Sequence, residues 1–207
     1  MKVAIVKYNA GNVFSVVNAL RRLGVEPVLT DDAAELRSAD RVVFPGQGEA
    51  SHAMSYLRSH GLDSVIVSLH QPLLGICIGQ QLLCRHSEEG DADCLGIFDT
   101  EVKRFRPQTN EYKVPCMGWN SLSQPAARTM VDPLMRGILS EDGSKPYVYF
   151  IHSYYVPLCE HTIAVADYTL NYSAALHRDN FYATQFHPEK SGDVGERILR
   201  NFIELDY

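Results

Sequence analysis

The segment PLLGICIGQQLL, residues 72–83, is the stretch of the sequence that decides the fold. A short apolar run leads through Gly75-Ile76-Cys77-Ile78-Gly79 into a helical pattern over QQLLCR, residues 80–85. Glycines two positions on either side of a residue permit a tight turn from strand to helix, because a larger side chain there would clash with neighbouring backbone. The pattern predicts that Cys77 stands at the end of a buried strand as a nucleophile, whose thiol the helix N-terminus would activate.

The first half of the chain alternates apolar runs with helical patterns. We expect strands over residues 3–8, 25–30, 41–46 and 72–77, and helices over 13–23, 33–38, 52–61, 62–69 and 80–85. Strands that are apolar throughout and separated by helices are typical of a parallel sheet that is covered on both faces. Cys84, within the last helical pattern, has no glycine frame and is expected to be a core residue.

The second half is rich in β-type segments. We expect strands within residues 95–105, 113–122, 147–157, 162–168, 173–179 and 181–188, loops with one helical turn over 124–146, and a final helix within 192–207. The sequence shows no internal repeat and no composition break. It therefore predicts one α/β domain over residues 1–207, with a mixed, mostly parallel sheet flanked by helices.

Composition and charge exclude several classes of protein. Of the 207 residues, 45% are apolar and 21% are charged, which is typical of a globular protein and not of a disordered or fibrous one. No apolar run approaches the ~18 residues of a membrane span, and MKVAIVKYNAGN lacks the pattern of a signal peptide, so we expect a cytoplasmic protein with no membrane partner. A net charge of −6 argues against a nucleic-acid partner, because neutralising phosphates requires clustered positive charge.

The five cysteines are an odd number and include no C-x-x-C pair. We therefore expect neither a disulfide framework nor a structural zinc site, and nothing else in the sequence indicates a metal or a cofactor. Outside the glycine frame of Cys77, the cysteines are expected to be small buried side chains.

A nucleophilic cysteine needs a base, and the base needs a group that orients it. Among eight histidines, His187 is the best placed, because it ends an apolar segment and opens His187-Pro188-Glu189. In an extended stretch, alternate side chains point the same way, so we expect the Glu189 carboxylate beside the His187 ring. His152, within the aromatic run YFIHSYY, can also line a site.

Two further segments belong at the same edge of the predicted sheet. Pro45-Gly46-Gln47-Gly48 follows the third strand, and its backbone N–H groups are candidate donors to an oxyanion; the simpler interpretation is an ordinary loop turn. Gln81 lies one helical turn after Cys77, so its amide is expected to face the same pocket. Open α/β sheets bind ligands at the carboxyl ends of their strands, which is where these groups meet.

These motifs resemble a known family. PGQG, GICIGQQ and QFHPEKSG are similar to the motifs of the class I (triad) glutamine amidotransferases, and YNAGNVFSV, VPCMGWN and YFIHSYY extend the resemblance over essentially the whole chain. The longer set resembles the branch of the family that supplies ammonia in histidine biosynthesis. The resemblance implies a flavodoxin-like fold, L-glutamine as substrate, and a (β/α)8-barrel partner, the cyclase subunit of imidazole glycerol phosphate synthase, in a heterodimer.

The resemblance also assigns roles to residues. It implies Cys77 as nucleophile, His187 as acid and base, and Glu189 as the group that orients His187. The oxyanion site would consist of Gly46, Gln47, Gly48 and Ile78, and the substrate contacts of Gln81, Ser153 and Tyr154. The implied partner contacts are Asn12, Trp119 and Lys190. For Trp119, the competing interpretation is a core aromatic residue. The family loop usually has valine where this chain has Gln47, so the peptide reorientation that completes the family's oxyanion hole is not carried over to this chain.

Other functions are compatible with the same motifs. A stand-alone cysteine hydrolase of related fold would act on peptide or γ-glutamyl substrates without a partner. A non-catalytic regulatory subunit would not use Cys77 at all, although the complete triad argues against this alternative. A sugar-modifying synthase is an alternative consumer of the ammonia, and only the identity of the partner separates it from the cyclase.

Overall fold

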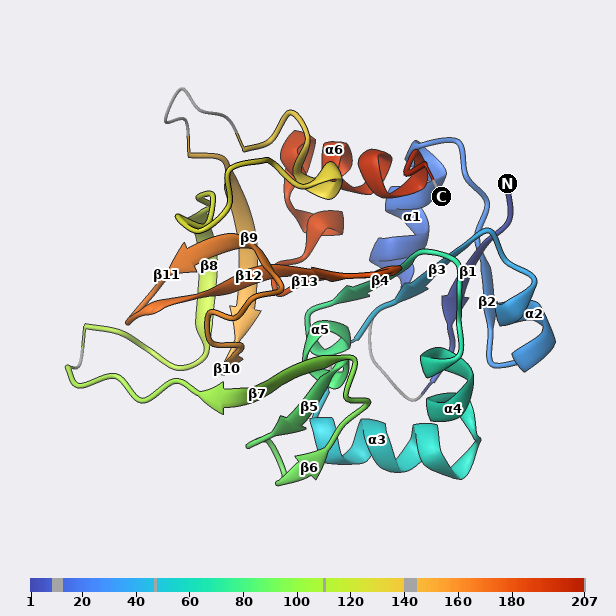
Figure 1. The fold of residues 1–207 in the computed structure, drawn as a ribbon, viewed down its shortest axis with the longest axis horizontal. Coiled ribbons are helices and arrows are strands. Elements are labelled where there is room, and N and C mark those ends of the chain that lie inside the picture. The colour runs from blue at the N-terminus through green and yellow to red at the C-terminus, as the bar shows by residue number, and fades with distance from the viewer. Residues whose placement is uncertain (9–12, 47, 110, 140–144, 207) are drawn as a thin grey trace.

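The protein is described by a computed structural model that covers residues 1–8, 13–46, 48–109, 111–139 and 145–206. Its central sheet has seven strands in the order β11-β12-β13-β4-β3-β1-β2 (Figure 1). The strands are β1 (Val3–Val6), β2 (Val28–Thr30), β3 (Arg41–Phe44), β4 (Leu73–Ile76), β11 (Thr162–Asp167), β12 (Asn171–Arg178) and β13 (Phe181–Thr184). The five strands from β2 to β13 run parallel, and β12 and β11 continue the sheet antiparallel. This confirms the predicted mixed, mostly parallel sheet.

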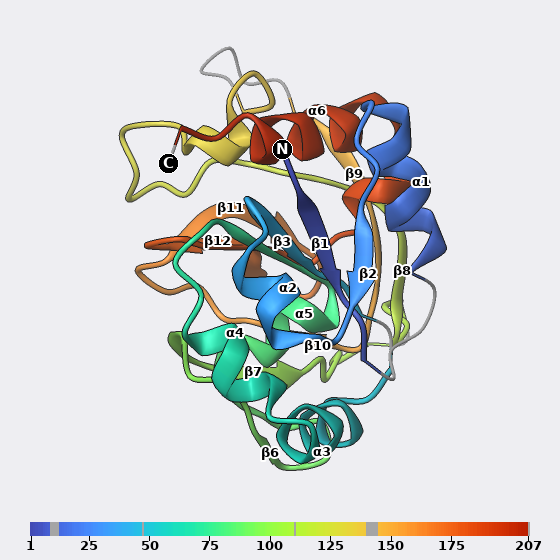
Figure 2. The same cartoon turned by 90° about the vertical axis from the view of Figure 1, so that its right-hand side faces the viewer.

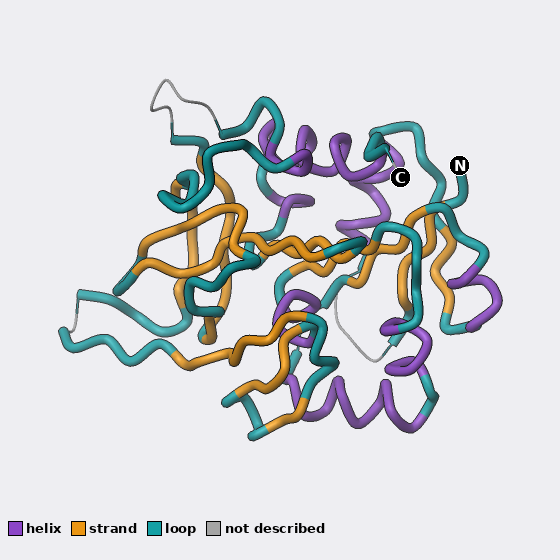
Figure 3. The backbone as a smooth tube through the Cα atoms, viewed as in Figure 1, coloured by secondary structure: helices purple, strands orange, loops and turns teal. Residues whose placement is uncertain are grey.

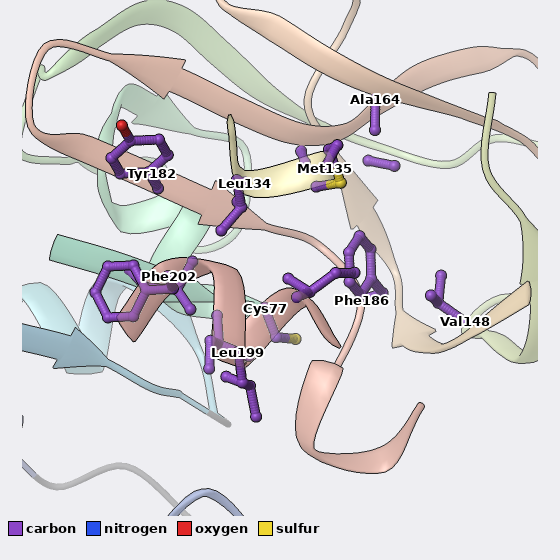
Figure 4. Packing of buried hydrophobic residues seen from close by; sticks show 14 of the residues in the cluster. Cys77, Leu134, Met135, Val148, Ala164, Tyr182, Phe186, Leu199 and Phe202 are labelled. Atoms are coloured by element: carbon purple, nitrogen blue, oxygen red, sulfur yellow. The ribbon is translucent and has the colours of Figure 1, made fainter. Parts of the chain in front are cut away.

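Helices cover both faces of this sheet (Figures 2 and 3). One face carries α1 (Phe14–Arg22) and α6 (Gly192–Ile203), and the other carries α2 (Ala33–Arg37), α3 (Ala50–Ser59), α4 (Leu62–Val67) and α5 (Ile78–Leu82). The alternation of β1 shows why both faces need cover: Val3 and Ile5 pack with α1 and α6, whereas Ala4 and Val6 pack with the helices opposite. Cys77 belongs to the first of these cores (Figure 4).

Two smaller sheets lie beside the central one. The first contains β5 (Cys84–Ser87), β6 (Ala92–Asp93), β7 (Phe98–Arg104) and β10 (Tyr154–Tyr155), and the second pairs β8 (Cys116–Ser121) with β9 (Tyr147–His152). Single 3-10 turns occur at η1 (Pro133–Met135) and η2 (Pro188–Lys190). The first of these is the helical turn expected within residues 124–146.

One predicted helix is wrong beyond its first turn. The helical pattern over residues 80–85 ends at Leu82, and Cys84 begins strand β5, which pairs in parallel with β7. The cause is tertiary: backbone N–H groups of Gly96 and Phe98 donate to Cys84 and Leu83 at 2.8 and 2.9 Å, so the chain joins a sheet. Cys84 is nevertheless fully buried, as expected of a core residue.

No helix in the described part of the chain is both long and apolar enough to cross a membrane. All five cysteines carry free thiols; Cys84 and Cys116 are buried in the core, whereas Cys94 and Cys159 are only half-buried.

Candidate active site

The predicted turn from strand to helix at Cys77 is confirmed. Strand β4 is buried throughout, Cys77 adopts φ 55° and ψ −109°, and α5 begins at the next residue. A positive φ is strained for a residue with a side chain, and such strain persists where surrounding contacts hold it. The Cys77 N–H donates to the Thr184 carbonyl at 2.8 Å, which ties the turn to the neighbouring strand β13.

Close packing explains the two glycines of this turn. A Cβ added to Gly75 would lie 2.9 Å from the Gly79 backbone, and one added to Gly79 would lie 2.1 Å from the Phe44 carbonyl oxygen. Neither position has space for a side chain, so α5 can approach β3 and β4 only with glycine there.

The topology brings three loops to one edge of the sheet. Strands β3, β4 and β13 are parallel neighbours, with Phe44 beside Gly75 and Thr184 beside Ile76. Their carboxyl ends lead directly into the glycine loop after β3, into Cys77, and into the segment that contains His187. Segments far apart in sequence thereby meet at the place where open α/β sheets bind ligands.

His187 and Glu189 form a buried pair. The Nδ1 atom of His187 lies 2.7 Å from Oε1 of Glu189, and their side chains are only 2% and 3% exposed. The extended backbone that we predicted across this pair is wrong, because Pro188–Lys190 is a 3-10 turn. The Ser191 hydroxyl holds that turn by donating to the His187 carbonyl at 2.6 Å, and the turn still brings carboxylate and ring together.

The charge of His187 follows from its neighbours. Burial alone would lower the pKa of His187, but interaction with the Cys77 sulfur and with the Glu189 carboxylate raises it to about 10. The ring is therefore an imidazolium at neutral pH. Its buried Nε2 has no hydrogen-bond partner among the described residues. The Nε2 proton is therefore available to the sulfur or to a bound substrate.

A cavity of about 320 Å³ opens over the sulfur, within the size range of small-molecule sites. It collects residues from six separate segments of the chain, and its lining consists of Gly48, Cys77, Ile78, Gln81, Glu89, Pro115, Ile151, His152, Ser153, Tyr154 and His187. The structure thus brings Gly48, Ile78, Gln81, Ser153 and Tyr154, all expected from the sequence, to the same cavity as Cys77 and His187.

Two amide side chains connect the wall of this cavity to the sulfur. Gln81 Nε2 donates to the Tyr154 carbonyl at 3.2 Å and to Gln185 Oε1 at 3.0 Å. Gln185 Nε2 in turn lies 3.9 Å from Cys77 Sγ. Sequence reasoning missed Gln185, although it stands two residues before His187, where an extended chain would present both side chains on one face.

His152 is a neutral histidine in the cavity wall. Its Nδ1 lies 2.7 Å from the Tyr154 carbonyl and therefore carries the proton, and its Nε2 lies 3.4 Å from the Tyr172 hydroxyl. Burial lowers the pKa of His152, and the positive charge of His187 lowers it further. The hydrogen bond to Tyr154 opposes this change, and the resulting pKa is about 4. The aromatic run around it was the only sequence signal for this position.

Glu89 is a second residue that sequence reasoning missed. One of its carboxylate oxygens accepts from the Ala50 N–H at 3.1 Å, and the side chain lines the cavity. Burial raises the pKa of Glu89, with a smaller contribution from nearby Glu49. The local sequence SEEGD is polar and unpatterned, so only the fold reveals that one of its carboxylate residues lines the cavity.

The glycine loop after β3 is described except for Gln47, which lies outside the described residues. A Cβ on Gly46 would come 2.0 Å from Ile78 Cγ2 and 2.4 Å from the Tyr8 hydroxyl, and that hydroxyl donates to the Pro45 carbonyl at 2.6 Å. Gly48 has φ +135° and lines the cavity. The loop is thereby packed against the first turn of α5.

The three expected partner contacts differ in their surroundings. Asn12 lies outside the described residues. Trp119 is 57% exposed and packs edge-on against Tyr149, so the interpretation as a core residue is wrong. Lys190 is half-buried and directly follows Glu189. Within the described ranges, no group of three or more His, Cys, Asp or Glu side chains is arranged to hold a metal ion.

Comparison with known proteins places the geometry in context. The family described as glutamine amidotransferase class-I matches residues 4–205. The imidazole glycerol phosphate synthase subunit HisH of Bacteroides thetaiotaomicron is 58% identical over 205 residues, which covers 99% of this chain and 100% of the relative. The subunit of the same name from Idiomarina loihiensis is 42% identical, over 99% of this chain and 98% of the relative.

Solved structures share the fold. A glutamine amidotransferase crystal structure has a TM-score of 0.68 at 21% identity, covering 98% of this chain and 97% of the other. The structure of PurLQS from Thermotoga maritima has a TM-score of 0.68 at 16% identity, with the same coverage of 98% and 97%. At these identities, the likeness concerns the fold alone.

Proposed function

We propose, from the premise that this chain belongs to the class-I glutamine amidotransferases, that Cys77, His187 and Glu189 are the residues that hydrolyse glutamine. The chain is a glutamine-hydrolysing enzyme, the glutaminase subunit of imidazole glycerol phosphate synthase in histidine biosynthesis, as relatives at 42–58% identity over the full chain indicate. The proposal rests on one observation: a strained cysteine and a histidine held 2.7 Å from a buried carboxylate open on one cavity.

The reaction begins with attack of the Cys77 sulfur on the side-chain amide carbon of glutamine. In the proposed reaction the attacking sulfur is an anion, and the protonated His187 ring beside it balances its charge. The carbonyl oxygen becomes an oxyanion, which the backbone N–H groups of Ile78 and the glycine loop would stabilise. His187 then protonates the departing nitrogen, the C–N bond breaks, and ammonia leaves a glutamyl thioester.

Hydrolysis of the thioester reverses the role of His187. The ring, now neutral, takes a proton from water, whose oxygen attacks the thioester carbon, and collapse releases glutamate and the Cys77 thiolate beside a protonated ring. Throughout both steps, Glu189 accepts from Nδ1 and keeps the Nε2 side of the ring directed at the reacting atoms.

The amino-acid end of glutamine requires groups of opposite charge. The Tyr154 carbonyl already accepts from Gln81 and His152, and we assign the binding of the α-carboxylate to the backbone N–H groups of Ser153 and Tyr154. Glu89 is the acidic group of the cavity wall, and we assign to it the α-ammonium. A cation beside Glu89 would offset the effect of burial on its pKa.

The product requires a partner. In water at neutral pH, most ammonia is protonated and cannot act as a nucleophile, so the ammonia must pass to a synthase through a sealed path. We propose a heterodimer with the (β/α)8-barrel cyclase subunit of the synthase, with Trp119, Lys190 and Asn12 at the interface. The exposure of Trp119 supports this assignment.

We further propose that residues 1–207 form one domain, in line with the family match over 4–205, and that the protein is cytoplasmic.

Substitution of the nucleophile tests the residue assignment. In the complex with the cyclase, Cys77→Ala is expected to abolish glutamine-dependent synthesis and to leave ammonia-dependent synthesis intact. Cys94→Ala is the matched control, because Cys94 is a free, half-buried thiol away from the cavity. Persistent glutamine hydrolysis by Cys77→Ala would overturn the assignment.

The alternatives are separated by the partner. Strong activity of the isolated chain on γ-glutamyl peptides would favour a stand-alone hydrolase. Capture of the native partner, followed by assay of the pair with glutamine, distinguishes the cyclase from a sugar-modifying synthase. Failure of Cys77 to form a glutamyl adduct in that pair would favour a non-catalytic subunit.

A further inference from the structure

Gln185 is a fully buried polar residue that the proposed chemistry does not use. It stands one residue beyond the end of β13, and its backbone N–H donates to the Ala174 carbonyl at 2.8 Å. Its side chain extends between Gln81 and the Cys77 sulfur, with polar contacts at both ends. A buried amide in contact with a nucleophile affects the charge that the nucleophile can carry.

The orientation of this amide follows from its neighbours. The Tyr154 carbonyl can only accept, so the Gln81 atom facing it must be the NH2 group. The same NH2 group faces Gln185, so the Gln185 atom at 3.0 Å must be the carbonyl oxygen. The remaining end of the Gln185 amide, its NH2 group, is therefore the end that lies 3.9 Å from the sulfur.

We propose that Gln185 is a further catalytic residue, whose side-chain N–H stabilises the anionic sulfur of Cys77 and whose orientation is set by Gln81. This inference rests on the proposed function, in which that sulfur is the nucleophile. The separation of 3.9 Å is long for such a bond, and catalytic hydrogen bonds commonly shorten when charge develops on the acceptor. A thiolate has donors on two sides in this arrangement, His187 and Gln185.

The hydrogen-bonded series Tyr154–Gln81–Gln185, which we call the relay, also connects substrate binding to the nucleophile. Tyr154 belongs to the segment assigned to the amino-acid end of glutamine, and its carbonyl orients Gln81, which orients Gln185. A variant at Gln185 should therefore lower the turnover number while leaving the Michaelis constant for glutamine nearly unchanged, since Gln185 itself does not line the cavity.

A buried glutamine next to this relay provides a matched control. Gln80 is as fully buried as Gln185, but its amide donates to the Ser173 carbonyl at 3.2 Å, whereas that of Gln185 lies against the sulfur. Gln80→Met therefore removes a buried amide of the same size without touching the nucleophile. A purely structural role of Gln185 would make Gln80→Met and Gln185→Met behave alike.

Alkylation of Cys77 in the full chain tests the proposal without glutamine. Iodoacetamide reacts with the thiolate, and mass spectrometry of the Cys77 peptide gives the rate at each pH. For Gln185→Met we expect the rate at pH 7 to fall about tenfold and its pH midpoint to rise by about one unit, since a hydrogen bond to a charged group is lost. Gln80→Met should match the wild type. Cys94, whose thiol pKa is raised by burial to about 12, is the internal reference.

A second variant keeps the test informative if Gln185→Met folds poorly. Gln185→Asn preserves a buried amide but is one methylene too short to reach the sulfur, so it should shift the pH midpoint in the same direction. An unchanged midpoint in both variants would overturn the role of Gln185. Because alkylation does not require glutamine, that result would leave the glutaminase assignment, tested by Cys77→Ala, unaffected.

Discussion

His187 Nδ1 and Glu189 Oε1 lie 2.7 Å apart inside the protein, where almost no solvent reaches either side chain. Replacing the carboxylate with an amide keeps the shape but removes the charge that supports the imidazolium. We expect Glu189→Gln to lower glutamine-dependent turnover at least about a hundredfold, because ring orientation and charge are both lost. Steady-state assay of the complex measures this.

Glu196→Gln is the control for that experiment. Glu196 is an exposed carboxylate that pairs with Arg200 at 3.4 Å on the surface of α6. Its neutralisation should leave turnover within a factor of about two, as surface ion pairs contribute little. Equal activity of Glu189→Gln and Glu196→Gln would contradict the role of Glu189.

The raised pKa of His187 makes stability depend on pH on the alkaline side. The group is protonated in both states below its ordinary value of 6.5, and its folded-state pKa is about 10. The stabilisation by its charge is therefore complete below pH 6.5 and is lost as the pH rises from 6.5 through 10. Chemical unfolding across this range should show a steeper loss for the wild type than for His187→Gln; parallel curves would be inconsistent with a charged His187.

His152 produces the opposite dependence on the acid side. Its folded-state pKa is about 4, below the ordinary 6.5, so between these values the unfolded chain binds the proton more readily. Stability should therefore fall as the pH is lowered from 6.5 to 4. NMR titration of the His152 ring is expected to give a midpoint near 4, and unfolding of His152→Gln should lose part of the acid slope. A midpoint near 6.5 would exclude the buried, neutral state.

The local features of the site could be predicted because they are short-range. Two glycines around Cys77 specify a turn that only small residues permit, and the apolar runs on either side specify a buried parallel sheet. The pairing of His187 with Glu189 was predicted for the wrong backbone, since the Ser191 hydroxyl and the 3-10 turn are not visible in the spacing. The 3-10 turn nevertheless brings the Glu189 carboxylate to the His187 ring, as the prediction required.

The missed residues depend on contacts between distant segments. Glu89 enters the cavity because its carboxylate accepts from the N–H of Ala50, which is 39 residues earlier. Gln185 meets Gln81 across 104 residues. Cys84 leaves its helical pattern for a strand because β7 offers backbone partners. Such pairings carry no periodicity, so a single sequence does not indicate them.

Gly79 should tolerate no side chain. A Cβ there would lie 2.1 Å from the Phe44 carbonyl oxygen, which is backbone of strand β3 and cannot move away without disturbing the sheet. We expect Gly79→Ala to lose more than about 3 kcal/mol of unfolding free energy, or to fail to fold. Gly24→Ala is the control: Gly24 has φ +79° with open space around it, so only backbone strain of about 1 kcal/mol is expected. Similar losses in both variants would contradict the packing argument.

Trp119 tests the partner surface. Its side chain is 57% exposed on β8, and large exposed aromatic residues commonly anchor interfaces, where truncation costs about 2 kcal/mol or more. We expect Trp119→Ala to weaken binding of the cyclase subunit at least about thirtyfold in a titration, with an unchanged unfolding transition of the isolated chain. Met130→Ala is the matched control, since Met130 is 79% exposed and lies in the loop before η1. Unaltered affinity in Trp119→Ala, with the variant folded, would remove Trp119 from the proposed interface.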